Sequence, residues 1–284
     1  MKITIARDAG YCFGVRDAVN LAYETAKERG DVYMLGDIVH NERVVEDLAE
    51  AGTKVVESLD DIPDDRPVLF RAHGTDEGVW DTAKDKGLDI VDATCPLVQE
   101  IHDEVEKLSK DGRQILIIGD HGHDEVVGIM SHADSPIVVA TPEEARALRK
   151  MKRAGVVSQS TQTIENVQAI INILMTKVFD LHFINTICFP TKRNQEQIKE
   201  LAAESDVMII IGSFTSANSK RLTELALGIN PKTYQVTCAE EIQPSWFNEA
   251  ERVGVSAGAS TPDYLIEEVH EKLQSISPVT EEVF

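Results

Sequence analysis

Residues 94–119 read TCPLVQEIHDEVEKLSKDGRQILIIG, and this stretch decides the fold. Apolar residues recur at Leu97, Ile101, Val105 and Leu108, which is the spacing of one helix face. The apolar run that ends at Gly119 is short enough for a buried strand. The stretch therefore predicts a helix that opens at a cysteine and proline and leads into a strand.

The same pattern occurs three times along the chain. Residues 11–36 read YCFGVRDAVNLAYETAKERGDVYMLG, and residues 187–212 read ICFPTKRNQEQIKELAAESDVMIIIG. In every copy a glycine stands 24 residues after the cysteine, and the pairs are Cys12 with Gly36, Cys95 with Gly119, and Cys188 with Gly212. Such self-similarity predicts three related structural units.

Each copy continues alike beyond its glycine. A second helical segment opens near His40, His123 or Ser216, and a later strand ends near His73, near Ser160 and Thr161, or near Ser260. Helices thus alternate with short apolar strands, which predicts an α/β fold of three small units with mainly parallel sheets, related by a pseudo-threefold axis. The predicted units are 13–95, 96–188 and 189–284, and strand 1–12 is expected to join the third.

The three repeated cysteines are expected to meet. Ligands bind at the carboxyl ends of parallel strands, and equivalent positions in three copies can face one another around the axis. A lone cysteine is more often a small buried hydrophobe, and common ancestry could also preserve a packing residue. Cys238 has Leu59 and Pro142 at its equivalent positions, so we expect a structural role for it. The candidate metal ligands are Cys12, Cys95 and Cys188.

Sulfur ligands from such dispersed positions favour an iron–sulfur cluster over zinc. Structural zinc sites usually pair their ligands at short spacing, whereas Cys-Pro, as at Cys95 and Pro96, recurs in cluster sites. A four-iron, four-sulfur cluster on three cysteines leaves one iron open to a substrate, for which it can act as a Lewis acid. We therefore expect one such cluster at the centre of the three units.

Histidines and neutral donors at the same strand ends predict an anion pocket. A neighbouring polyanion favours the charged form of histidine. The candidate binding residues are His40, His73, His123, Ser216, Asn218 and Ser260, and a diphosphate is the expected ligand. The sequence has no phosphate-binding or dinucleotide-binding glycine motif, so we expect no bound NAD(P) or FAD and a separate electron donor.

Composition limits the partners. The chain has 284 residues and a formal net charge of −21, which disfavours nucleic acid and anionic membrane surfaces as partners. The sequence has four cysteines, no basic and apolar leader and no apolar run of membrane-spanning length. We therefore expect a cytoplasmic protein, with no nucleic acid or membrane partner, that is a monomer or a weak dimer.

The motifs together resemble the LytB family of 4-hydroxy-3-methylbut-2-enyl diphosphate reductases along essentially the full chain. They are GYCFGV at Cys12, DIVHN at His40, RAHG at His73, DATCP at Cys95, GHDEVVG at His123 and Glu125, SQST at Ser160 and Thr161, TICF at Cys188, SANS at Ser216 and Asn218, and AGAST at Ser260. The resemblance implies a three-lobed fold around a four-iron cluster on the three cysteines. It also implies reductive removal of the substrate's hydroxyl as water, which gives isopentenyl and dimethylallyl diphosphate.

The resemblance also assigns roles to single residues. Glu125, beside His123, would supply or relay the proton, and Ser160 or Thr161 would orient the hydroxyl. Two positions depart from the family pattern: Ala217 follows Ser216 where a second hydroxyl is frequent, and Ser160 replaces a usual threonine. The first departure predicts the loss of one diphosphate donor, and the second leaves a hydroxyl whose rotamer is less constrained.

Other interpretations and one partner surface complete the predictions. A hydrolase with a Cys–His pair would explain one thiol, and a cluster- or zinc-holding sensor would explain all three without catalysis. The family's expected electron donor is reduced ferredoxin or flavodoxin. Because such donors are acidic, we predict a basic docking face formed by Lys192, Arg193, Lys220 and Arg221.

Overall fold

The computed structural model describes residues 1–276 and 280–283. The chain divides into two compact units, and each is described separately. The central unit comprises Arg16–Val39 and Val45–Cys188, and the terminal unit comprises Met1–Val15, His40–Val44 and Phe189–Phe284. The short segment His40–Val44 therefore belongs to a different unit from the residues on either side of it.

The first sheet of the central unit has the strand order β3-β2-β4-β5, and all of its strand pairs are parallel. Its strands are β2 (Val32–Leu35), β3 (Thr53–Val56), β4 (Pro67–Phe70) and β5 (Asp89–Asp92). The helices of this part of the chain are α1 (Phe13–Arg29), α2 (Glu42–Glu50) and α3 (Glu77–Asp85). Val68 and Phe70 of β4 are buried in one apolar cluster with Ala83 of α3.

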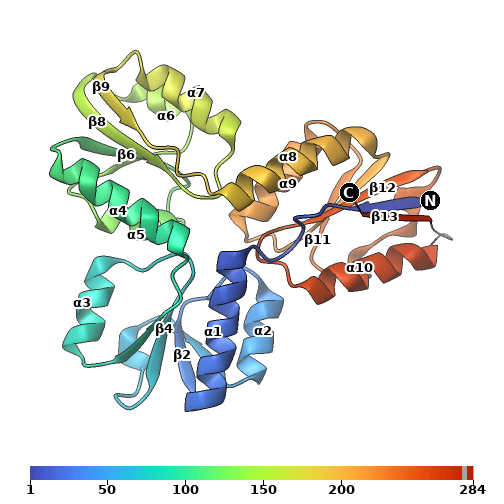
Figure 1. Ribbon diagram of the computed structural model, residues 1–284, viewed down its shortest axis with the longest axis horizontal. Helices are drawn as coiled ribbons and strands as arrows, with labels where there is room; N and C mark the ends of the chain where they lie inside the picture. The colour runs from blue at the N-terminus through green and yellow to red at the C-terminus, as the bar shows by residue number, and fades with distance from the viewer. Residues whose placement is uncertain (277–279, 284) are drawn as a thin grey trace. The chain divides into compact units, whose positions relative to one another are not determined.

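The second sheet of the central unit repeats this order as β7-β6-β8-β9, again with parallel pairs (Figure 1). Its strands are β6 (Gln114–Ile118), β7 (Ile137–Val139), β8 (Met151–Ser158) and β9 (Val178–Phe183). Its helices are α4 (Pro96–Lys110), α5 (Asp124–Ser131), α6 (Pro142–Ala147) and α7 (Ile164–Leu174). Alternate residues of β6 enter different cores, because Ile115 packs with α4 and α5 whereas Leu116 packs with α6 and α7. Helices therefore cover both faces of this sheet.

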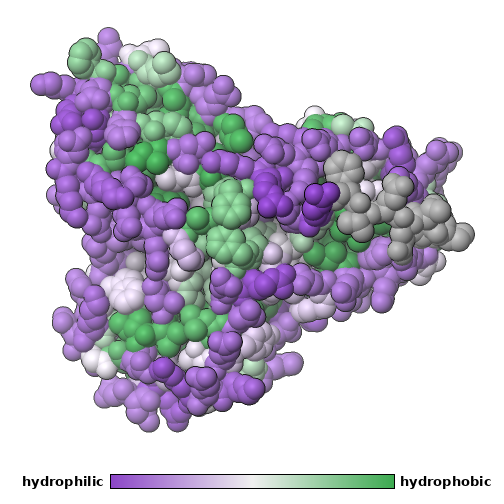
Figure 2. Space-filling model, in the orientation of Figure 1, coloured by the Kyte–Doolittle hydropathy of each residue, from purple (hydrophilic) through white to green (hydrophobic). Residues whose placement is uncertain are grey.

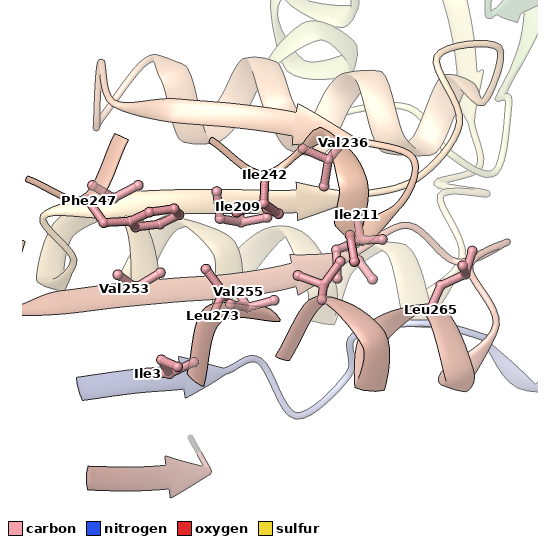
Figure 3. Close-up of a cluster of buried hydrophobic side chains, with 14 residues drawn as sticks. Ile3, Ile209, Ile211, Val236, Ile242, Phe247, Val253, Val255, Leu265 and Leu273 are labelled. Atoms are coloured by element: carbon pink, nitrogen blue, oxygen red, sulfur yellow. The ribbon is translucent and has the colours of Figure 1, made fainter. Parts of the chain in front are cut away.

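The sheet of the terminal unit has the order β11-β10-β12-β1-β13. Its strands are β1 (Lys2–Ile5), β10 (Val207–Ile211), β11 (Thr233–Val236), β12 (Arg252–Ala257) and β13 (Thr280–Val283). Its helices are α8 (Phe189–Glu204), α9 (Ala217–Leu227) and α10 (Asp263–Ile276). Figure 3 shows one of its two cores, in which Ile209 of β10 and Val255 of β12 pack with Leu273 of α10.

Strand order confirms the predicted repeat. The orders β3-β2-β4-β5, β7-β6-β8-β9 and β11-β10-β12-β1 are equivalent, and β1 takes the fourth place in the terminal sheet, paired with β12 from Lys2 and Arg252 onward. The α/β class with parallel sheets is therefore confirmed. The boundaries 13–95, 96–188 and 189–284 stay a prediction, because each range holds one sheet while compactness groups the first two sheets together.

Helix α4 shows how the sequence periodicity acts. Ile101, Val105 and Leu108 are buried as predicted, but the fourth buried apolar position is Val98, and Leu97 is only half-buried. Leu97 and Val98 precede Ile101 by four and three residues, so both lie near the same face of the helix, and the packing buries Val98 more deeply. The start of α6 depends on residues that are close in sequence, because the Thr141 hydroxyl accepts from the Glu144 N–H and caps the helix.

The visible surface is largely polar. Figure 2 shows hydrophilic side chains over most of the visible face. Within the described ranges, no helix is both long enough and apolar enough to cross a bilayer.

Candidate active site

The three candidate ligand cysteines occupy equivalent local positions. Each is half-buried, follows the fourth strand of its sheet and directly precedes a helix. The backbone N–H of Cys12 donates to Ala259 O at 3.3 Å, that of Cys95 to Ala72 O at 3.0 Å, and that of Cys188 to Ser160 O at 3.0 Å. These acceptors lie just beyond the third strand of each sheet, β12, β4 or β8. The repeat therefore fastens each cysteine in the same way at the carboxyl end of its sheet.

Glu125 is a buried carboxylate of the central unit. It lies in the first turn of α5 and is 2% exposed. Its Oε1 accepts from the Ser160 N–H at 2.5 Å, and its Oε2 accepts from the Ser160 hydroxyl at 2.8 Å. A carboxylate can interact with the helix dipole while it remains in water, so that role does not require burial. Burial of Glu125 costs desolvation free energy, and the two hydrogen bonds from Ser160 offset this cost.

His123 is the N-cap of α5, and this bond sets its tautomer. Its Nδ1 accepts from the Glu125 N–H at 3.1 Å. A ring nitrogen that accepts carries no proton, so the proton of the neutral ring lies on Nε2, which can donate to an anion. The His73 ring stands edge-on to His123, with centroids 5.7 Å apart. The structure thus brings two of the predicted histidines together, and one of them, His123, is bonded to the backbone of Glu125.

Gln159 is a site residue that the sequence interpretation missed. It is fully buried, and its Oε1 accepts from the Asp120 N–H at 3.0 Å while its Nε2 donates to the Thr161 hydroxyl at 3.0 Å. The side chain therefore holds the end of β6 and orients Thr161. A signal was present, because Gln159 stands inside the SQST motif directly before Ser160 and Thr161, the two candidate residues of that motif.

The terminal unit holds the second group of predicted residues. Ser260 Oγ donates to His40 O at 3.1 Å. Ser216 is the N-cap of α9, and its hydroxyl accepts from the Ser219 N–H at 3.3 Å. Asn218 lies in the first turn, is 6% exposed, and its Nδ2 has no hydrogen-bond partner among the described residues. A buried amide donor at a helix N-terminus is suited to an anionic ligand.

Two glycines let α9 approach the strand ends. A Cβ at Gly212 would lie 2.3 Å from Ser219 Oγ, and a Cβ at Gly258 would lie 2.1 Å from the same atom. Gly212 follows β10 and Gly258 follows β12, so both strands end against the first turn of α9. Any side chain at these positions would push that turn, and Asn218 with it, away from the sheet.

Two other predictions have different outcomes. Cys238 is the N-cap of a short 3₁₀ helix after the edge strand β11, so its place in the repeat is not equivalent to that of the other three cysteines. The predicted basic docking face is wrong at Arg221, which is only 9% exposed in α9 and cannot meet a partner protein. Arg193 is exposed, but it is paired with Asp8 at 2.6 Å. A run of basic letters does not reveal which side of a helix faces the sheet.

The strand order, the repeated cysteine positions and the buried polar residues define a family. A model of the LytB protein family matches residues 3–274, and the chain belongs to this family. The 4-hydroxy-3-methylbut-2-enyl diphosphate reductase of Geotalea uraniireducens is 42% identical over 278 residues, which cover 98% of both chains.

Solved structures agree with this assignment. One is described as (E)-4-hydroxy-3-methyl-but-2-enyl diphosphate reductase, the terminal enzyme of the non-mevalonate pathway; it is 40% identical, has a TM-score of 0.72, and the match covers 96% of this chain and 99% of that one. The E-1-hydroxy-2-methyl-but-2-enyl-4-diphosphate reductase from Plasmodium falciparum is 26% identical with a TM-score of 0.94, over 99% of this chain and 92% of that one.

Proposed function

We propose that this chain is a 4-hydroxy-3-methylbut-2-enyl diphosphate reductase, an oxidoreductase of the terminal step of the non-mevalonate route to isoprenoids. The reaction takes up two electrons and two protons, breaks the allylic carbon–oxygen bond and releases water with isopentenyl or dimethylallyl diphosphate. One observation carries the proposal beyond family membership. Ser160 holds the Glu125 carboxylate through its N–H and hydroxyl, and its carbonyl holds the N–H of Cys188. A proton donor and a cluster ligand are thereby joined through one residue.

The donor set fits an iron–sulfur cluster. Three half-buried thiols at repeated positions, each on a fastened backbone, offer the soft ligands that iron–sulfur clusters require. In this proposal Cys12, Cys95 and Cys188 hold one four-iron, four-sulfur cluster, and one iron has no protein ligand. When bound, the cluster supplies the electrons and a Lewis-acidic site for the hydroxyl.

In this proposal, residues of the central unit donate the proton and orient the substrate hydroxyl. Glu125 is the general acid that lets hydroxide leave as water. Ser160 and Thr161 orient the hydroxyl, and Gln159 keeps Thr161 in place through the 3.0 Å bond from its amide. His123, with its proton on Nε2, donates toward the oxygens of the substrate.

In this proposal the diphosphate is held by histidine, serine and asparagine side chains. The proposed set is His40, His73, His123, Ser216, Asn218 and Ser260. The unpartnered amide of Asn218, at the start of α9, supports this assignment because an anionic oxygen would supply the acceptor that it lacks. Ala217 offers no hydroxyl, so this chain is proposed to hold the diphosphate with one donor fewer than the family pattern has.

The electrons come from a partner protein in this proposal. The sequence has no glycine motif for a nicotinamide or flavin dinucleotide, so a separate electron donor is proposed. Reduced ferredoxin or flavodoxin is the donor that the family resemblance implies. With Arg221 buried, the remaining basic candidates for a docking face are Lys192, Arg193 and Lys220. We further propose a cytoplasmic location and a monomer or weak dimer.

Anaerobic purification followed by turnover tests the function. We expect iron and sulfide in near-equal amounts, no stoichiometric zinc, and conversion of 4-hydroxy-3-methylbut-2-enyl diphosphate to the two product diphosphates with a small chemical reductant. The same preparation exposed to air should lose both colour and turnover. A zinc-loaded protein, or a cluster-loaded protein that converts none of the substrate, would contradict the proposal in favour of a sensor.

A further inference from the structure

Glu42 occupies an unusual place in the chain. It opens helix α2, and it lies within His40–Val44, the short segment that belongs to the terminal unit although residues 16–39 and 45–188 belong to the central unit. Two groups of contacts hold this segment in the terminal unit. One is the bond from Ser260 Oγ to His40 O at 3.1 Å, and the other is made by the Glu42 carboxylate.

The Glu42 carboxylate accepts hydrogen bonds from the loop that follows β10. Its Oε1 accepts from the Ser213 hydroxyl at 2.8 Å and from the Thr215 hydroxyl at 3.2 Å. Ser213 is itself 2% exposed, and its Oγ accepts from the Thr215 N–H at 2.9 Å. The exposed Glu42 carboxylate is thus bonded to the buried Ser213 hydroxyl, which also holds the loop through the Thr215 N–H.

The charge of Glu42 is maintained at neutral pH. Burial by itself would raise the pKa of this carboxyl, but the pKa is lowered overall by the bond from its own N–H, by the Ser213 and Thr215 hydroxyls, and by attraction to His40. Charge-assisted hydrogen bonds of this kind are stronger than bonds between neutral groups. The contact is therefore made by the ionised form.

The two ends of this contact both lead to proposed diphosphate donors. Glu42 stands two residues after His40. The loop to which it is bonded, through Ser213 and Thr215, is followed directly by Ser216, the N-cap of α9. The N–H of Ser216 donates to Ser213 O at 3.3 Å, so a hydrogen bond joins this loop to the start of the helix. A shift of either partner would move His40 relative to Ser216 and Asn218.

We propose that Glu42 is a positioning residue that sets the spacing of His40 and the α9 donors and so determines affinity for the diphosphate group. The inference rests on the proposed function. Glu42 occupies in its copy of the repeat the place that Glu125 has in the second copy, two residues after a candidate histidine. The two carboxylates have diverged, because Glu125 holds Ser160 within the central unit whereas Glu42 holds the α9 loop.

A purely structural role makes a different prediction. A glutamate in the first turn of a helix stabilises that helix through its dipole. Its loss would then lower the stability of α2 and leave the affinity for diphosphate unchanged. Measurements of affinity and turnover on the folded enzyme therefore separate the two roles.

The test compares Glu42→Ala, Glu42→Gln and the control Glu50→Ala, which removes an exposed carboxylate from the last turn of the same helix. KM for the substrate is measured in turnover, and the Kd of inorganic diphosphate is measured by calorimetry on the cluster-loaded protein. We expect Glu42→Ala to raise both by about five- to thirtyfold, with kcat within about twofold and an unchanged visible spectrum. Glu42→Gln keeps an acceptor oxygen without the charge, so a smaller rise is expected. Glu50→Ala should leave all values unchanged.

Several outcomes would overturn the inference. KM and Kd that match the Glu50→Ala control would do so, as would a loss of kcat with no change in KM. If Glu42→Ala does not fold, Ser213→Ala removes the same bond from the other side and should weaken diphosphate binding likewise. A wild-type enzyme that converts no substrate contradicts the proposed function, whereas active enzyme with indifferent Glu42 variants contradicts only this inference.

Discussion

At the scale of single residues, the contact between Glu125 and Ser160 has the greatest consequence for chemistry. The carboxylate is 2% exposed and is held at both oxygens by one serine. Such a group is costly to bury, and its bonds to Ser160, just beyond the end of β8, place it among the candidate site residues. Its neighbour Ser160 replaces a usual threonine but keeps the hydroxyl that the contact uses.

Glu125→Gln should turn over at least about a hundredfold more slowly, because glutamine keeps the size of the side chain but cannot deliver a proton. The cluster content and the affinity for substrate should be retained. Single-turnover conversion after chemical reduction of the cluster measures the effect.

Glu144→Gln is the matched control for this prediction. Glu144 is also a first-turn carboxylate of the central unit, but it accepts from the Ala140 N–H at 2.8 Å and lies 3.0 Å from His121. Its loss should leave turnover within about twofold. Conversion by Glu125→Gln at near wild-type speed would assign Glu125 to structure, and the proton would have to come from another group.

At the scale of elements, the packing of α3, α4 and α5 involves a stacked pair of histidines, of which His102 is buried and His132 is half-buried. His102 of α4 stacks on His132 at the end of α5, with centroids 4.2 Å apart. His132 Nδ1 lies 3.3 Å from Glu77 of α3 and 3.2 Å from Glu106 of α4. A Cβ at Gly74 would lie 2.7 Å from the His102 ring, so α4 also packs closely on the turn after His73.

This pair predicts a loss of stability in acid. Burial, and then the charge of His132, lower the pKa of His102 from 6.5 to about 4, although Glu106 acts in the opposite direction. In the unfolded chain His102 therefore binds a proton near pH 6.5, whereas in the folded chain it binds one only near pH 4. The free energy of unfolding should fall by roughly 3 kcal/mol across that interval and be insensitive to this group above it.

Urea midpoints between about pH 7.5 and about pH 4.5 measure this slope. His102→Gln removes the titrating group and should flatten the slope, whatever its effect at neutral pH. His182→Gln, at an exposed position on β9 of the same unit, should retain the wild-type slope. Parallel curves for wild type and His102→Gln would show that other groups cause the acid sensitivity.

At the scale of the whole molecule, the threefold repeat predicts that three cysteines act as a set. Each is fastened by its backbone N–H to the loop beyond the third strand of its sheet. Cys238 follows an edge strand and lacks this arrangement. The chain thus contains its own control for the proposed cluster.

Cys12→Ser, Cys95→Ser and Cys188→Ser should each lose most of the cluster or all activity, because a hydroxyl is a poor ligand for these irons. Iron and sulfide per chain, with the visible absorption, measure the loss after anaerobic purification. Cys238→Ser should keep both the cluster and the turnover. Bleaching of Cys238→Ser to the same extent as the other three would contradict the proposed three-ligand site with its open iron.

The sequence by itself determined the class of fold and the candidate site. Helix period, apolar runs and a cysteine-to-glycine spacing of 24 residues are local properties, and their repetition predicted three equivalent parallel sheets. The pairing of β1 with β12 also follows the expectation that the N-terminal strand joins the last unit. The period missed one position of α4, because Leu97 and Val98 lie four and three residues before Ile101 near the same helix face, and only the packing makes Val98 the buried one.

Only the tertiary structure decided which polar groups meet. Glu125 and Ser160 are 35 residues apart, and Glu42 and Ser213 are 171 residues apart, so no local pattern contains either contact. The same holds for the bonds of Gln159 and for the burial of Arg221, which depends on the side of α9 that faces the sheet. Periodicity defines an element and its apolar face, but the path of the backbone through each loop decides which donor reaches which acceptor.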